Sequence, residues 1–79
     1  MERNEIIKRV NEIIVDQLGV AIDSVKETSS FDGDLYADSL DNVEIVMEVE
    51  RSFGISVSDK EADSLKTVGD IYDIVAKKV

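Results

Sequence analysis

The sequence contains no cysteine, histidine, proline or tryptophan. Without cysteine the chain has no disulfide and no thiolate that could act as a nucleophile or metal ligand. Without histidine it lacks the side chain that most often serves as a general base near neutral pH. Without proline, the ends of its helices and turns must be set by glycines and capping side chains. These absences argue against an enzyme, and we expect no catalytic residue.

Basic residues are also scarce, since nine lysines and arginines face 18 acidic residues and leave a net charge of −9. Nucleic acids and anionic lipids carry the same sign, so neither is an expected partner. No apolar run is long enough for a membrane span, and the start "MERNEIIKRV" lacks the hydrophobic region of a signal peptide. We therefore expect a cytoplasmic monomer, not inserted in a membrane, that binds proteins with basic surfaces.

Apolar residues recur at three- and four-residue spacing in several segments, and no strand-like alternation is present. Gly19 and Gly54 are typical of helix ends, and Ser58 with Glu61 has the spacing of a capping box that begins a short helix. The apolar positions are Ile6, Ile7, Val10, Ile13, Ile14 and Leu18 in the first segment, Leu40, Val43, Val46, Met47, Val49 and Phe53 in the second, and Val68, Ile71, Tyr72 and Val75 after Thr67.

The connection between residues 19 and 37 is long for so small a protein. Apolar residues divide it, which predicts that it folds against the core; these are Val20, Ile22, Val25, Phe31 and Leu35. The pattern as a whole predicts an all-α fold. We expect a small four-helix bundle of three longer helices and one short helix, with a long ordered loop between the first two. With 79 residues it should form one domain, residues 1–79.

The start of the second helix concentrates polar side chains. Asp38 is a good N-cap, Asp41 falls at the third helical position, and Ser39 becomes the first helical residue with its hydroxyl in solvent. Asp41, Glu44 and Glu48 share one stripe, because they lie three and four residues apart. Such a stripe is often only a solvated face. However, residues 27–50 contain no basic residue, and like charges at this spacing destabilise a helix. Recognition of a basic partner explains the stripe better.

The segment "DGDLYADSLDNVE" has a superficial likeness to a calcium-binding loop. Counted from Asp32, the sixth residue is Ala37 where such a loop has glycine, and the twelfth is Val43 where it has glutamate. A specific metal site is therefore not expected.

The segment "ADSLDNVEIVMEVE" closely resembles the modification site and recognition helix of acyl carrier proteins. Residues 53–75, "FGISVSDKEADSLKTVGDIYDIV", resemble the third and fourth helices of that family, so the resemblance covers nearly the whole chain. It implies that Ser39, between Asp38 and Leu40, is esterified by 4′-phosphopantetheine, which a phosphopantetheinyl transferase takes from coenzyme A. The thiol of that group would carry growing acyl chains as thioesters.

The resemblance also implies two surfaces. A docking face would bind basic patches on fatty acid synthase enzymes and acyltransferases, and an acyl pocket would shelter the chain. The docking residues would be Asp41, Glu44, Met47, Glu48 and Glu50, and the pocket residues Val46, Val57, Ala62, Leu65 and Ile71.

Four residues depart from the family pattern: Tyr36 where glycine is usual, Arg51 where a carboxylate is expected, Ser58 where proline is familiar, and Ile71 where a smaller residue is common. These departures leave open a specialised carrier for polyketide, aminoacyl or unusual lipid chains. A further alternative from another class is an unmodified acidic helical adaptor that binds basic proteins.

Overall fold

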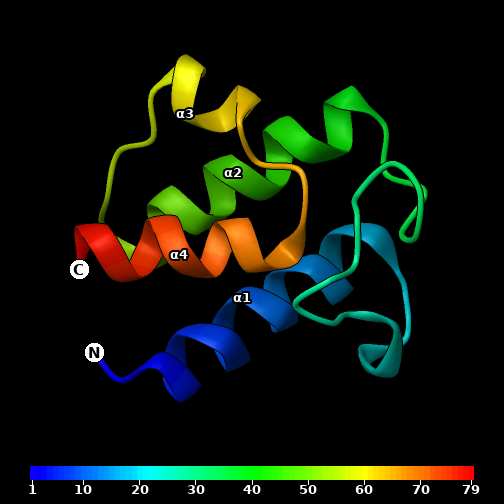
Figure 1. Cartoon of the computed structure of the whole chain (residues 1–79), viewed down its shortest axis with the longest axis horizontal. Helices are drawn as coiled ribbons and strands as arrows, with labels where there is room; N and C mark the ends of the chain where they lie inside the picture. The colour runs from blue at the N-terminus through cyan, green and yellow to red at the C-terminus, as the bar shows by residue number, and fades with distance from the viewer.

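The computed structural model describes all 79 residues, and it contains four α-helices and no strand (Figure 1). The predicted all-α fold, with three longer helices, one short helix and a long connection after the first, is confirmed. The two chain ends lie on the same side of the molecule (Figure 1). In chain order the elements are α1 (Arg3–Leu18), the 3-10 turn η1 (Ile22–Ser24), α2 (Ser39–Phe53), α3 (Asp59–Asp63) and α4 (Val68–Lys78).

Local capping chemistry sets the boundaries that the sequence predicts, whereas the start of α1 at Glu2 has no side-chain cap. Gly19 and Gly54 follow α1 and α2 in the left-handed conformation, each with φ of 66°, and their N–H groups donate to carbonyls of the preceding turn. Such a φ favours glycine because it has no Cβ. At the start of α3 the predicted capping box is present: the Ser58 side chain accepts from the Glu61 N–H, and the Glu61 side chain accepts from the Ser58 N–H.

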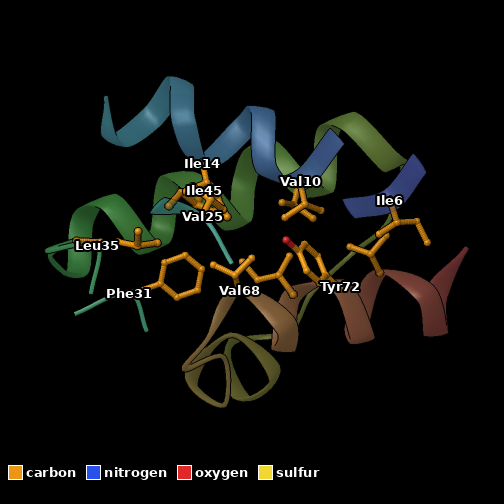
Figure 2. Close-up of a cluster of buried hydrophobic side chains, with 13 residues drawn as sticks. Ile6, Val10, Ile14, Val25, Phe31, Leu35, Ile45, Val68 and Tyr72 are labelled. Carbon is orange, nitrogen blue, oxygen red and sulfur yellow. The ribbon is translucent and has the colours of Figure 1, made fainter. Parts of the chain in front are cut away.

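The core is mainly aliphatic and lies between α1, α2 and α4 (Figure 2). α1 contributes Ile6, Val10 and Ile14, all 1% exposed or less. α4 contributes Val68, Ile71, Tyr72 and Val75, together with the buried Gly69. The Tyr72 hydroxyl donates to the side-chain oxygen of Asn11 on α1, which satisfies the one polar atom that this ring brings into the core.

The long loop is part of the core. Val25, Phe31 and Leu35 are buried as predicted, and Figure 2 shows Phe31 beside Val68 at the start of α4. The prediction for Ile22 is wrong, because its side chain is 53% exposed. Ile22 begins the η1 turn, which the apolar spacing does not predict. The turn leaves its side chain outside the buried core cluster, whereas Val25, three residues later, belongs to that cluster.

Backbone hydrogen bonds fix the loop to the start of α4. The Phe31 N–H donates to the Lys66 carbonyl at 3.2 Å, the Val68 N–H to the Ser29 carbonyl at 3.0 Å, and the Gly69 N–H to the Glu27 carbonyl at 2.9 Å. These bonds hold the loop before α2 in one position. The loop therefore also fixes where α2 begins.

α2 differs from its apolar pattern in which residues it buries. Ile45 and Val49 enter the core, whereas Leu40, Val43 and Met47 are between 51% and 65% exposed. Apolar residues occur around most of this helix, so the spacing alone does not define which face packs against α1 and α4. No helix of the structure is both long and apolar enough to cross a membrane.

Candidate functional site

The N-terminus of α2 is closed by a capping box of Asp38 and Asp41. The predicted N-cap, Asp38, is confirmed, and the return bond to the Asp41 side chain is an addition that the sequence did not predict. The Asp41 N–H donates to Asp38 Oδ1 at 2.9 Å, and the Asp38 N–H donates to Asp41 Oδ2 at 3.2 Å. This reciprocal pair fixes the first turn of the helix. Both carboxylates are therefore held against backbone N–H groups at the positive end of the helix dipole.

Ser39 is the first residue of α2 and is exposed. No hydrogen bond joins its hydroxyl to another group of the chain, and the N–H groups of Ser39 and Leu40 have no acceptor within the chain. Free N–H groups at a helix start favour an anion such as a phosphate placed beside them. The chain has no histidine, the usual base beside a serine nucleophile, and no basic side chain hydrogen-bonds this hydroxyl. The arrangement suits a hydroxyl that another protein modifies.

Tyr36, just before this site, has a φ of 55° and is the only non-glycine residue with positive φ. Its side chain is 86% exposed, whereas the next residue, Ala37, is buried and donates its N–H to the Phe31 carbonyl at 2.7 Å. A non-glycine residue in this conformation is uncommon because its Cβ approaches the backbone. The φ explains why glycine suits this position.

A groove of about 390 Å³ opens beside Ser39, between α2 and α3. Half of its 14 lining residues are hydrophobic, so part of its wall suits an apolar guest, and the other half are polar or charged. Four of the five residues expected in an acyl pocket line it: Val46, Val57, Ala62 and Leu65.

Ile71, the fifth expected pocket residue, does not line this groove. It is 2% exposed and lines a smaller inner cavity of about 30 Å³. The groove and the inner cavity share several lining residues, namely Phe31, Asn42, Val46, Ala62 and Leu65. Ile71 therefore lies deeper in the molecule than the other four.

Polar contacts hold α3 over the groove. Lys78 Nζ of α4 lies 3.2 Å from Glu61 Oε1, and the Val57 N–H donates to Glu50 Oε2 at 2.9 Å. The pKa of Glu61 is lowered, first by the Ser58 N–H that its carboxylate accepts and next by Lys78. Glu50 thus fixes the segment before α3, in addition to any part it has in docking.

The acidic stripe of α2 is only partly free. Glu44 accepts a hydrogen bond from Gln17 of α1, and Glu48 Oε1 lies 2.6 Å from Arg51 Nη1. Met47, between them, is 51% exposed. Arg51 therefore neutralises part of the stripe at its far end. Across the whole structure, no three acidic side chains are grouped so that they could hold a metal ion.

Sequence reasoning missed several residues of this region. Val43 is exposed beside the acidic side chains, and it forms an apolar strip with Leu40 and Met47, which the sequence already placed at the site. Their spacing of three and four residues was the available signal. The other missed groove residues come from the loop, from α2 and from the α3 region, and only the fold brings them together: Phe31, Asp32, Asn42, Asp59, Asp63 and Lys66.

Several known proteins resemble this chain in sequence and in structure. A family profile described as a phosphopantetheine attachment site matches residues 8–75. The acyl carrier protein of Thermosynechococcus vestitus is 46% identical over 79 residues, which are 100% of this chain and 98% of that protein. A solved structure of acyl carrier protein from Enterococcus faecalis matches with a TM-score of 0.83 and 33% identity, and covers 100% of both chains. The chain therefore belongs to the acyl carrier protein family, whose members carry acyl chains on a 4′-phosphopantetheine cofactor.

Proposed function

We propose that Ser39 carries the 4′-phosphopantetheine group and that the chain, as one carrier domain of residues 1–79, delivers acyl groups to enzymes of fatty acid synthesis. The observation that carries this proposal is the position of Ser39. It is an exposed hydroxyl at the start of α2, it follows a doubly hydrogen-bonded Asp38, and it borders a groove with a partly apolar lining.

The residues around Ser39 suit the attached group. The N–H groups of Ser39 and Leu40 are free to donate to its phosphate, and the helix dipole favours the negative charge. When bound, the group supplies a thiol, which this chain lacks, and the thiol forms thioesters with acyl groups. Asp38 positions the serine through its cap, while Leu40, 65% exposed, offers an apolar contact to the transferase. No residue of the chain performs a catalytic step.

The acyl chain itself would lie in the groove. Val46, Val57, Ala62 and Leu65 cover its sides, and Ile71 closes the inner cavity beneath them. Burial of apolar carbon contributes about 0.8 kcal/mol per methylene. The groove therefore shields the chain from water between partners.

Partner enzymes would dock on the exposed side of α2. Glu44 and Glu48 attract basic patches, and Met47 supplies an adaptable apolar contact. Asp41 and Glu50 contribute charge at the two ends of this face, although both also accept backbone hydrogen bonds. We infer that these partners are a phosphopantetheinyl transferase, enzymes of fatty acid synthesis and acyltransferases.

A mass measurement tests the proposal. Incubation of the chain with coenzyme A and a phosphopantetheinyl transferase should add one phosphopantetheinyl group, and peptide mapping should place it on Ser39. Ser39→Ala should gain no mass and should unfold like the natural chain, because the hydroxyl has no partner. Ser56→Ala, at another exposed serine, should be modified normally.

Either of two results would contradict the assignment. Modification of Ser39→Ala would place the group on another residue, and an unmodified natural chain would favour an adaptor that only binds basic proteins. Asp38→Ala should lower the free energy of unfolding by about 1 kcal/mol through loss of the N-cap, and should also slow modification. The acyl groups found on protein purified from its native cells would separate fatty acid synthesis from a specialised pathway.

A further inference from the structure

One buried side-chain atom of the molecule lacks a hydrogen-bond partner, and it belongs to Asn42. Its Oδ1 is enclosed by the protein and accepts no hydrogen bond. Asn42 lies on α2, three residues after Ser39, so both side chains project from the same side of the helix. Buried polar atoms are nearly always satisfied in folded proteins. An exception beside a binding groove indicates a partner that the chain itself does not supply.

Asn42 lies where the two spaces meet, since it lines both the groove and the inner cavity. The other residues of the inner cavity are all hydrophobic: Phe31, Ile45, Val46, Ala62, Leu65 and Ile71. A guest that passes from the groove into this cavity must therefore be apolar. Along that path, the Asn42 carboxamide is the one polar group of the inner cavity that can select among guests.

A resident water molecule explains the free oxygen poorly. The inner cavity of about 30 Å³ has room for one water, but a buried water normally makes about three hydrogen bonds. Asn42 is its only polar lining residue. The cavity therefore holds a water weakly, and a guest that brings both apolar carbon and one donor fits it better.

We propose that, when an acyl chain enters and parts the side chains around it, Asn42 Oδ1 accepts a hydrogen bond from a hydroxyl on that chain, so that this carrier shelters hydroxyacyl chains in preference to saturated ones. The hydroxyl belongs near the thioester end of the chain, because Asn42 also lines the groove beside Ser39, through which the chain would enter the inner cavity. The inference rests on the proposed function, in which Ser39 carries the chain.

The test compares chains that differ only at the carbon two bonds from the carbonyl. Coenzyme A analogues with amide-linked hexanoyl, 3-hydroxyhexanoyl and 3-oxohexanoyl chains are attached to the natural protein, to Asn42→Val and to Val46→Ala. Val46 is the matched control, because it lines the same two spaces and carries no polar atom. The measurements are the melting temperature and the NMR shift of the Asn42 side-chain amide, for each loaded form and for the protein with the unacylated group.

In the natural protein the 3-hydroxy form should melt higher than the hexanoyl form by about 4–8 °C, the shift expected from one buried hydrogen bond in a domain of this size. The difference should persist in Val46→Ala and vanish in Asn42→Val. The Asn42 amide signal should move only with the 3-hydroxy chain. This second measurement needs no variant, so it decides the question even if Asn42→Val folds poorly.

Several results would overturn the inference. Equal melting of the hexanoyl and 3-hydroxy forms, or an undiminished difference in Asn42→Val, would remove Asn42 from selection. If the Asn42 amide signal already moved with the unacylated group, the donor to Oδ1 would be an N–H of that group. If the 3-oxo chain, which has no donor, raised the melting temperature as much as the 3-hydroxy chain, Asn42 would donate the hydrogen bond instead of accepting it. If no analogue attached to Ser39, the proposed function would fail first, and the missing mass gain would show it.

Discussion

At the scale of single residues, the backbone at Tyr36 carries the clearest sign of strain. A φ of 55° brings Cβ of a non-glycine residue close to its own backbone, and the exposed ring gains little packing in return. The conformation persists because the buried Ala37 and its hydrogen bond to Phe31 fix the chain on one side, and the Asp38 cap fixes it on the other. The strain is thus held next to Ser39.

Glycine should therefore be better tolerated than alanine at position 36. We expect Tyr36→Gly to raise the free energy of unfolding by about 1 kcal/mol relative to Tyr36→Ala, because glycine adopts positive φ without a Cβ contact. Alanine removes the ring and keeps the Cβ, so it is the matched control. Urea unfolding of the two variants measures the difference. Equal stability would show that the backbone at this position is unstrained.

At Gly69 glycine is required for a different reason. The backbone conformation would accept any residue, but there is no room beside the Cα for a side chain. A Cβ added there would lie 2.7 Å from Glu27 Cγ and 2.9 Å from the Glu27 carbonyl oxygen. That carbonyl also accepts the Gly69 N–H at 2.9 Å, so it cannot withdraw without loss of a bond between loop and helix.

Gly69→Ala should consequently lower the free energy of unfolding by about 1–3 kcal/mol, the usual cost of overpacking. The direction of this change is informative, because helix propensity alone would make the alanine variant more stable by about 1 kcal/mol. Ala76→Gly, at an exposed position of the same helix, is the control and should cost no more than this propensity difference. Thermal unfolding measures both, and a stabilised Gly69→Ala would mean that the loop yields easily.

At the scale of elements, the sequence predicts features that depend on residues close together in the chain, such as helix caps. It predicts poorly those that depend on how distant segments pack, such as the exposure of a side chain. The caps at Asp38 and Ser58 are local, because each box joins residues three positions apart, and both are confirmed. The exposure of Leu40 and Ile22 depends on where other segments pack, and no local spacing reports it. The same holds for the groove, since Phe31 and Lys66 reach it from distant parts of the chain.

The capping box of α4 makes the stability of this helix depend on pH. The pKa of Asp70 lies below its ordinary value of 3.8, first because its carboxylate accepts the Lys66 N–H and also because it accepts from Thr67. A lowered folded-state pKa means that the contribution is fully present above 3.8 and is lost as pH falls through the folded pKa.

Asp70→Asn should therefore cost about 1 kcal/mol near neutral pH, a value at the low end for charged hydrogen bonds because the side chain is partly exposed. The cost should shrink as pH falls below 3.8, where the natural carboxylate itself becomes protonated. Urea unfolding from about pH 6 to about pH 2 measures it. Asp63→Asn, at an exposed carboxylate outside any N-terminal cap, is the control for the loss of one surface charge. A cost that stayed constant with pH would contradict the role of the charge.

At the scale of the whole molecule, charge is distributed unevenly. The segment from Glu27 to Glu50 has no basic residue, whereas the two ends of the chain contain most of the lysines and arginines. Arg3 near the N-terminus joins two carboxylates of other segments, Glu27 at 3.3 Å and Asp73 at 2.9 Å, and so ties the loop and α4 to α1. Arg3 thus stabilises the fold far from α2, and within α2 Arg51 is the one basic side chain that pairs with the acidic stripe, at Glu48.

This separation predicts how charge reversal alters docking. Glu44→Lys should slow association with a phosphopantetheinyl transferase by about 3–10-fold at low salt, and the effect should shrink as salt screens the charges. Glu12→Lys, on an exposed part of α1, makes the same change in net charge and should alter the rate much less. Arg51→Ala should have the opposite sign and speed association, because it frees Glu48 from its 2.6 Å ion pair. Stopped-flow measurements over a range of salt concentrations compare the three. If Glu44→Lys and Glu12→Lys slowed association equally, net charge alone would steer the partner, and the face of α2 would have no special part in docking.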